Sequence, residues 1–296
     1  MESRAMFRNV VVGVDGRRGG RDAIALATHL AGTRGQLALA HVHPGGRAPV
    51  RAETESPGRA SSLELLELER TSAGVKAKLL AIASRSVGGG LHVLAQRNAC
   101  DLLVVGSCSR GFFERATGGD ATRAALNCGG CAVAVAPAGY AEHPAALSEI
   151  GVGYDGTPES EQALSVAHAI AAEHGARISA FEAVAIHPNL FSAGSTSFGE
   201  AIDVIIRGAR ERIETHADVE AHVALGAAAR ELSLFSASID LLVTGSHGHG
   251  PLGRFIHGST SNELARSASC ALLVLPAGPP APRTSPASEL VANATR

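Results

Sequence analysis

Aromatic residues and lysine are scarce in this sequence, and tryptophan is missing. Phe, Trp and Tyr together make up 3% of the 296 residues, and the lysines are confined to Lys76 and Lys78. The core must therefore be aliphatic, built mostly from Val, Leu, Ile and Ala. A net charge of −2 and the lack of basic clusters interleaved with aromatic residues argue against a nucleic-acid partner.

Long apolar runs are also missing. None approaches the ~18–20 residues needed to cross a bilayer, and residues 1–8 lead into the first apolar segment without a signal core. The five cysteines are odd in number and scattered, which does not resemble a secreted disulfide framework. We therefore expect a cytoplasmic protein that does not associate with membranes and keeps its thiols reduced.

Two cysteines, Cys128 and Cys131, have the spacing of a redox or metal site. However, Cys131 opens an apolar strand and matches Cys270, which has no such neighbour. Burial in a strand explains a cysteine of this kind without any redox or zinc role. The sequence therefore predicts no metal site.

An internal repeat organises the chain. Five residues recur 245 minus 106, or 139, positions later: Gly106, Arg115, Gly119, Cys131 and Pro137 return as Gly245, Arg254, Gly258, Cys270 and Pro276. The segment Val11–Gly16 returns as Gly151–Gly156 at 155 minus 15, or 140, positions. Such a period indicates two copies of one domain. We predict domain 1 over residues 1–142, domain 2 over 148–277, a linker over 138–148 and a disordered tail over 278–296.

Each copy alternates apolar strands with helices, which is typical of a doubly wound α/β fold. In the second copy we predict strands near residues 149–154, 177–183, 219–225, 239–244 and 270–275.

A glycine and hydroxyl motif follows the fourth of these strands. Gly245 and Gly248 let the backbone turn tightly and approach a ligand, and Gly258 does so again before the next helix. Ser259, Thr260 and Ser261 then supply hydroxyls at a helix start, where the dipole and free N–H groups attract anions. The pattern predicts a phosphate cradle, although glycines also end strands and cap helices for backbone reasons alone.

Two further side chains could belong to this cradle. His247 could donate to a phosphate or be a solvated loop residue. Arg254 could reach a β- or γ-phosphate or form a surface salt bridge.

The strand-one aspartate, the GxxG-x9-G-[ST] pattern and the ending Cys-Ala-Leu-Leu-Val-Leu-Pro together resemble the universal stress protein family in its tandem-domain form. The resemblance implies a five-stranded parallel sheet of the Rossmann-like, adenine nucleotide α-hydrolase-like kind in each domain. It also implies that the strand-five edges pair as an internal pseudo-dimer, and it leaves a homodimer of the chain open.

The resemblance further implies that ATP, with or without Mg²⁺ or Mn²⁺, binds at the carboxyl ends of the strands. The residues implied for the ribose and adenine are Gly153, Tyr154, Asp155, Ala183, Thr244 and Gly245. Those implied for the phosphates are His247, Gly248, Gly258, Ser259, Thr260 and Ser261.

Domain 1 departs from the pattern. It offers Asp15, Val42, Gly106 and Gly119 at matching positions, but Ser109 replaces the second glycine and Asp120 replaces the hydroxyl residue. A carboxylate a few ångströms from phosphate, at an effective dielectric constant of ~20, repels it by ~3–4 kcal/mol. We therefore expect weak binding or none here, although aspartate is also simply a good helix N-cap.

No catalytic constellation accompanies these motifs. The sequence has no Walker-type Gly-Lys-Ser, no nucleophile with an evident base and no base placed to activate water. Gly13-Val14-Asp15-Gly16 is not the GxGxxG of a dinucleotide-dependent oxidoreductase. We expect an ATP-binding regulatory or stress-response protein that acts mainly through domain 2 and engages an unidentified protein partner. A slow ATPase and an interaction module without nucleotide are the alternatives.

Overall fold

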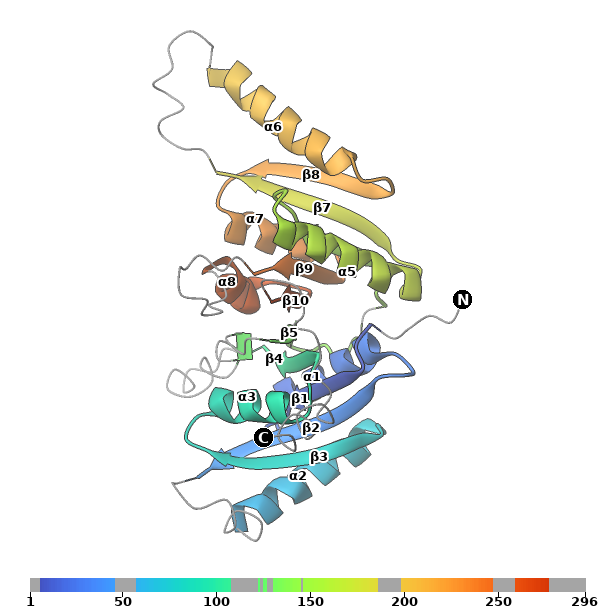
Figure 1. Ribbon diagram of the computed structural model, residues 1–296, viewed down its shortest axis with the longest axis vertical. Helices are drawn as coiled ribbons and strands as arrows, with labels where there is room; N and C mark the ends of the chain where they lie inside the picture. Colours follow the sequence, from blue (N-terminus) through green and yellow to red (C-terminus); the bar gives the residue numbers. More distant parts are fainter. Residues whose placement is uncertain are drawn as a thin grey trace, which may run out of the picture.

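The computed structural model describes residues 6–45, 57–107, 122, 125–126, 130–144, 146–185, 198–246 and 259–276. Within domain 1, strands and helices alternate as predicted up to residue 106, and the described residues Thr122, Ala125 and Leu126 are helical before the last strand (Figure 1). The strands and longer helices are β1 (Asn9–Gly13), α1 (Arg18–Ala31), β2 (Gln36–Pro44), α2 (Pro57–Ala73), β3 (Ala77–Ser84), α3 (Val87–Arg97), β4 (Leu102–Gly106) and β5 (Ala132–Ala136).

Domain 2 repeats this order. Its elements are β6 (Glu149–Gly153), α5 (Pro158–His174), β7 (Arg177–Val184), α6 (Phe198–Glu214), β8 (Val219–Leu225), α7 (Ala228–Phe235), a 3-10 turn η4 (Ser236–Ser238), β9 (Leu241–Gly245), α8 (Ser259–Ser267) and β10 (Ala271–Leu275). The predicted strands of this copy are confirmed to within two residues at each end. The predicted tail, 278–296, lies outside the described residues.

The strands form one ten-stranded sheet in the order β3-β2-β1-β4-β5-β10-β9-β6-β7-β8. All neighbours within each domain are parallel, whereas β5 and β10 are antiparallel, with Ala134 opposite Leu273. Each domain therefore has the doubly wound fold predicted from its pattern and the five-stranded parallel sheet implied by the family resemblance. The two edge strands expected to pair do so, which covers backbone groups that an edge strand would leave exposed.

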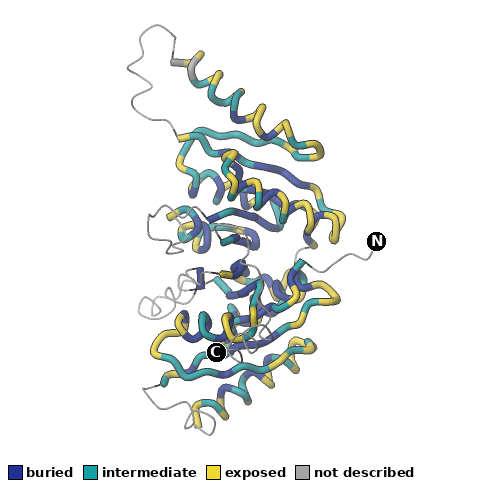
Figure 2. The backbone as a smooth tube through the Cα atoms, in the orientation of Figure 1, coloured by how far each residue is buried: buried dark blue, intermediate teal, exposed yellow. Residues whose placement is uncertain are grey.

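Helices cover both faces of the sheet. On one face, residues of α1, α2, α5 and α6 pack against alternate strand residues such as Val12 and Val152. On the other face, α3, α7, α8 and Leu126 pack against residues such as Val11 and Leu242. Figure 2 shows that the buried backbone is concentrated in the central strands, and every residue of β5 and β10 is buried. The core is aliphatic, as the composition predicts.

The predicted linker is packed against domain 1. The buried carboxylate of Asp22 on α1 accepts hydrogen bonds from the N–H groups of Gly139 (3.0 Å) and Ala141 (2.8 Å). Tyr140 is 4% exposed, and its hydroxyl lies 2.9 Å from Nδ1 of His29. The chain between the domains is thus fixed to the first helix by buried polar contacts.

Among the residues that the structure describes, the helices are too short or too polar to cross a bilayer.

Candidate functional site

The candidate site lies where the strand order of domain 2 reverses. After β6 the chain crosses to β7 on one side, whereas β9 pairs with β6 on the other, with Gly153 opposite Thr244. In doubly wound sheets, ligands bind in the crevice at the carboxyl ends of two such strands. Asp155 follows β6 at this point of the sheet, and Gly245 ends the neighbouring strand β9.

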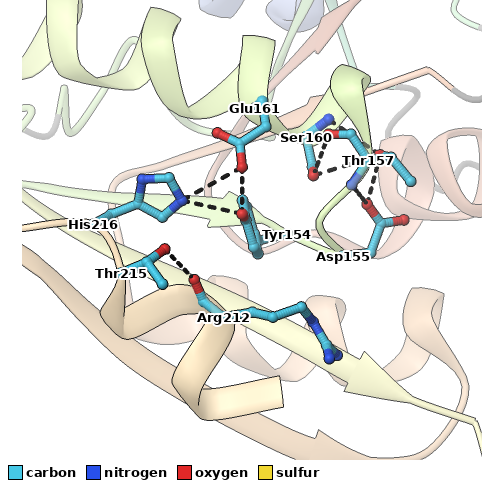
Figure 3. Close-up of polar contacts among 8 residues, drawn as sticks. All are labelled: Tyr154, Asp155, Thr157, Ser160, Glu161, Arg212, Thr215 and His216. Atoms are coloured by element: carbon cyan, nitrogen blue, oxygen red, sulfur yellow. Dashed lines mark hydrogen bonds and ion pairs between the residues drawn. The ribbon is translucent and has the colours of Figure 1, made fainter. Parts of the chain in front are cut away.

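A tight turn after β6 fixes the orientation of Asp155. Its Oδ1 accepts hydrogen bonds from the N–H (3.1 Å) and the hydroxyl (2.6 Å) of Thr157, as Figure 3 shows. The Thr157 hydroxyl in turn accepts from the N–H of Ser160 at 3.3 Å and caps α5, which begins with Pro158. The exposed carboxylate of Asp155 is therefore held at the strand end by a helix cap.

The corresponding aspartate of domain 1 lies in a similar turn. Asp15 follows β1, and its Oδ1 accepts the N–H of Arg17 at 3.0 Å. However, the N-cap residue Arg17 makes no side-chain capping hydrogen bond to α1. The two aspartates share a backbone arrangement but differ in the side chains that support it.

Close packing requires a glycine at residue 245. The sequence pattern alone does not separate this requirement from a role in phosphate binding. A Cβ at this residue would lie 2.6 Å from the carbonyl oxygen of Glu159, in the first turn of α5. A Cβ at Gly106 would lie 2.1 Å from the carbonyl oxygen of Gly19 in α1. Both glycines therefore let a helix start approach the end of a central strand.

The residues around the ends of β7 and β9 differ in exposure. Thr244 is 6% exposed, and its buried hydroxyl has no hydrogen-bond partner in the part of the chain that the structure describes. Ser246 is also buried, and its N–H donates to the carbonyl of Leu275 at 3.0 Å. Ala183 is partly exposed near the end of β7.

The hydroxyl residues after the motif begin helix α8. Ser259 is exposed, Thr260 is partly exposed and Ser261 is 4% exposed. All three lie in the first turn, where N–H groups have no intrahelical acceptor. Of their side chains, those of Ser259 and Thr260 have access to solvent.

Four predicted site residues of domain 2, His247, Gly248, Arg254 and Gly258, lie outside the described residues, as does Gly119 of domain 1. Val42 is partly buried in β2 and packs toward Gly90 of α3.

Tyr154 contributes to the core with its side chain. Its ring is 5% exposed, and its hydroxyl bonds to a carboxylate oxygen of Glu161 on α5 and lies 3.0 Å from Nε2 of His216, as Figure 3 shows. Burial, together with the hydrogen bond to Glu161, raises the pKa of Tyr154 to about 12. A ligand at the strand ends would therefore meet the backbone of Tyr154 and not its phenol ring.

A buried ion pair lies on the same face of the sheet. The carboxylate of Glu182 on β7 is 8% exposed and pairs with the half-exposed guanidinium of Arg212 on α6. The second carboxylate oxygen, Oε2, is buried without a partner among the described residues. The sequence analysis did not identify Glu182 or His216. For Glu182 the available signal was a charged residue in the middle of an apolar strand.

The chain has clear relatives. The model of the universal stress protein family matches it twice, over residues 6–137 and 147–276. Universal stress protein Rv2005c of Mycobacterium tuberculosis is 31% identical over 228 residues, which is 74% of this chain and 77% of the relative. Universal stress protein Mb2028c of Mycobacterium bovis matches with the same values.

Solved structures with both domains share the fold. A universal stress protein from Archaeoglobus fulgidus aligns with a TM-score of 0.64 at 14% identity and covers 91% of this chain and 98% of its own. The functionally unknown protein PA1789 from Pseudomonas aeruginosa aligns with a TM-score of 0.63 at 16% identity, with 92% and 93% covered.

Proposed function

The chain belongs to the universal stress protein family, and we propose that it is a regulatory or stress-response protein that binds ATP through domain 2. The observation that carries the proposal is the juxtaposition of Asp155 and the β9 motif at the point where the strand order reverses. This is where a doubly wound sheet offers a ligand the free ends of its strands.

The residues at this crevice suit an adenine nucleotide. Asp155 offers an exposed, oriented carboxylate, which is a suitable acceptor for ribose hydroxyls. The backbone of Gly153, Tyr154 and Ala183 would border the base. The buried hydroxyl of Thr244, which has no hydrogen-bond partner among the described residues, would add a polar group beside it.

The start of α8 suits the phosphates. Ser259 and Thr260 offer accessible hydroxyls beside the free N–H groups of the first turn. His247, Gly248, Arg254 and Gly258 would complete this half of the site, with Mg²⁺ or Mn²⁺ as an optional counter-ion. Ser261, whose side chain is buried, would contribute its N–H.

The proposal includes a cytoplasmic location and a regulatory role. The thiols of Cys100, Cys131 and Cys270 are not disulfide-bonded, which suits a reducing compartment. Nucleotide occupancy would change the surface around the strand ends and hence which protein partner can bind there.

The first test is to denature freshly purified protein and to quantify the released nucleotide by chromatography and mass spectrometry. About one adenine nucleotide per chain is expected. Two per chain would contradict the asymmetry between domains. None, together with no heat of binding in an ATP titration with Mg²⁺, would overturn the nucleotide proposal and favour an interaction module.

A reciprocal pair of variants tests which domain binds. Ser259→Asp copies the carboxylate of Asp120 into domain 2 and should weaken ATP binding ~100- to 1000-fold, because ~3–4 kcal/mol of repulsion corresponds to two to three decades. Asp120→Ser in domain 1 should leave the affinity of the domain 2 site unchanged. Unchanged ATP affinity of Ser259→Asp would contradict the assignment of α8 to the phosphates.

A further inference from the structure

Two cysteines that are distant in sequence meet at the amino ends of β4 and β5. Cys100 follows α3 directly after Ala99, whose φ of +45° turns the chain sharply. Cys131 immediately precedes β5. The Cys100 thiol donates to the carbonyl of Leu102 at 3.0 Å, and Cys100 packs against the same core cluster that contains Cys131. Cys128, the partner that sequence spacing suggests for Cys131, lies outside the described residues.

The strand register places this pair at a distance suited to a disulfide. Leu102 lies opposite Ala132, and the N–H of Ala132 donates to the carbonyl of Asp101 at 3.1 Å. Neighbouring strands are about 4.8 Å apart and advance about 3.3 Å per residue. Continued by one residue, this register sets Asp101 opposite Cys131, with Cys100 next to Asp101 in the chain. Strand spacing then gives a Cα separation of roughly 6 Å for Cys100 and Cys131, within the ~4.4–6.8 Å that a disulfide spans.

The two thiols differ in access and reactivity. Cys131 is 6% exposed within the core, whereas Cys100 is partly exposed and gives solvent a route to the pair. The hydrogen bond from Cys100 lowers the pKa of Cys131, because a donor stabilises the thiolate. The same contact and burial raise the pKa of Cys100.

Domain 2 has the same hydrogen bond at the strand start without the pair, although a 3-10 turn over Ser236–Ser238 stands where domain 1 turns at Ala99. The N–H of Ala271 donates to the carbonyl of Asp240 at 3.2 Å, as that of Ala132 does to Asp101. Cys270 therefore matches Cys131, and the position of Cys100 is occupied by Ile239. Burial raises the pKa of Cys270 to about 12, which leaves an inert thiol. Cys270 in domain 2 is thus an internal control for the reactivity of Cys131.

We propose that Cys100 and Cys131 form a reactive dithiol that small hydroperoxides oxidise to a disulfide. One sulfur attacks the O–O bond of hydrogen peroxide, which gives a sulfenic acid and releases one water. The other sulfur then attacks the sulfenic sulfur and displaces its hydroxyl group, which leaves as a second water with the thiol proton. Two thiols and one peroxide give one disulfide and two waters.

The disulfide would close a covalent loop around the domain 1 counterpart of the nucleotide motif. That motif, from Gly106 to Gly119, lies between the two cysteines in the sequence. Oxidation would therefore cross-link residues on either side of this segment and leave domain 2 without a disulfide. Because the inference concerns domain 1, it does not depend on nucleotide binding.

The test exposes the folded full-length chain to hydrogen peroxide, blocks the remaining thiols with an alkylating reagent and maps disulfides by mass spectrometry without reduction. A Cys100–Cys131 link should form, disappear with dithiothreitol and persist in Cys108→Ser and Cys128→Ser. It should be lost in Cys100→Ser and in Cys131→Ser. A Cys128–Cys131 link instead, or no intramolecular link, would overturn the proposal.

Two domain 2 variants sharpen the test. Cys270→Ser should leave the yield and rate of the link unchanged. Ile239→Cys should create a second, peroxide-dependent disulfide with Cys270, because it restores the missing thiol at the same register. Failure of a folded Ile239→Cys protein to form that bond would show that strand register alone does not produce the pair and would count against the inference.

Discussion

Domains 1 and 2 have the same strand order, but they fill the space beneath the first strand with different side chains. Domain 1 places Val14 there, and the neighbouring helices are joined by a bidentate ion pair between Arg21 on α1 and the buried Glu69 on α2. Domain 2 places Tyr154 at the matching position, bonded to Glu161 and His216. An apolar contact with one ion pair in domain 1 thus corresponds to a polar network in domain 2.

The comparison separates what the backbone requires from what each domain adds. Gly106 and Gly245 have the same role in both copies, because a helix start lies against each of them. By contrast, His41 on β2 bonds to the carbonyl of Val14 at 2.7 Å, whereas the matching Glu182 on β7 pairs with Arg212. The repeat keeps residues that the chain geometry demands, and the side chains below the strand ends have diverged.

The largest effect should come from the shared glycines. We expect Gly106→Ala to lower the free energy of unfolding by about 3 kcal/mol and Gly245→Ala by about 2 kcal/mol, because each Cβ would collide with backbone that cannot move aside. Urea unfolding measures both. Gly199→Ala on α6, where a Cβ meets nothing within 4 Å, is the control and should be neutral or stabilising. Equal tolerance at all three positions would contradict the packing argument.

The next effect concerns the buried ion pair of domain 2. Arg212→Ala should lower the free energy of unfolding by about 1–2 kcal/mol, because the buried carboxylate of Glu182 loses its half-exposed counter-charge. Adding Glu182→Gln should recover part of this loss in the same unfolding assay. Arg177→Ala removes an exposed ion pair with Glu149 and should change little. An Arg212→Ala variant as stable as Arg177→Ala would show that Glu182 is hydrated or protonated.

A smaller effect should separate the two helix starts. Thr157→Ala removes the cap of α5 and should cost about 1 kcal/mol, whereas Thr157→Ser should retain it. Arg17→Ala at the start of α1 removes no capping hydrogen bond and should cost less. Urea midpoints of the three variants test this order. A larger loss for Arg17→Ala would reverse the comparison.

A further comparison concerns a pH dependence that both domains share. The chain has two tyrosines, and burial raises the pKa of each, Tyr140 and Tyr154, to about 12. The folded-state pKa lies above the ordinary value of about 10, so the protonated phenols stabilise the folded protein. This contribution to the free energy of unfolding is fully present below pH ~10. It is lost as the pH rises toward about 12.

Ultraviolet absorbance can follow this titration, because the chain contains no tryptophan. Tyrosinate should appear near pH 12 in the folded protein, and each Tyr→Phe variant should remove half of the signal. A phenol that titrates near pH 10 before unfolding would show that its ring is more accessible than the structure indicates.

The fold was predictable because its signals are local or periodic. Apolar runs, glycine punctuation and the 139-residue repeat located the strands to within two residues. Pairing of the strand-five edges followed from the family resemblance. These features depend on short segments, in which residue type and spacing determine the structure.

The side-chain networks were not predictable, because their members come from separate elements. Nothing in the sequence around Tyr154 indicates that its ring contacts His216, which lies on a loop after α6. Cys100 and Cys131 come from two separate strand starts that pack into one core cluster, whereas sequence spacing pairs Cys131 with Cys128. The motif and the family resemblance predict a nucleotide role for Gly245, and its close contact with Glu159 adds a packing requirement that the sequence does not reveal.

The antiparallel junction between β5 and β10 influences the directions in which the carboxyl ends of the strands point in the two domains. An antiparallel junction in a flat sheet would direct the strands of the two domains toward opposite sides. Here the ten strands form nine neighbouring pairs, and a twist of ~20–25° per pair accumulates to roughly half a turn. In Figure 1, β2 and β3 accordingly run toward the same side of the molecule as β7 and β8. One partner that approaches from that side could therefore meet the carboxyl ends of both domains at once.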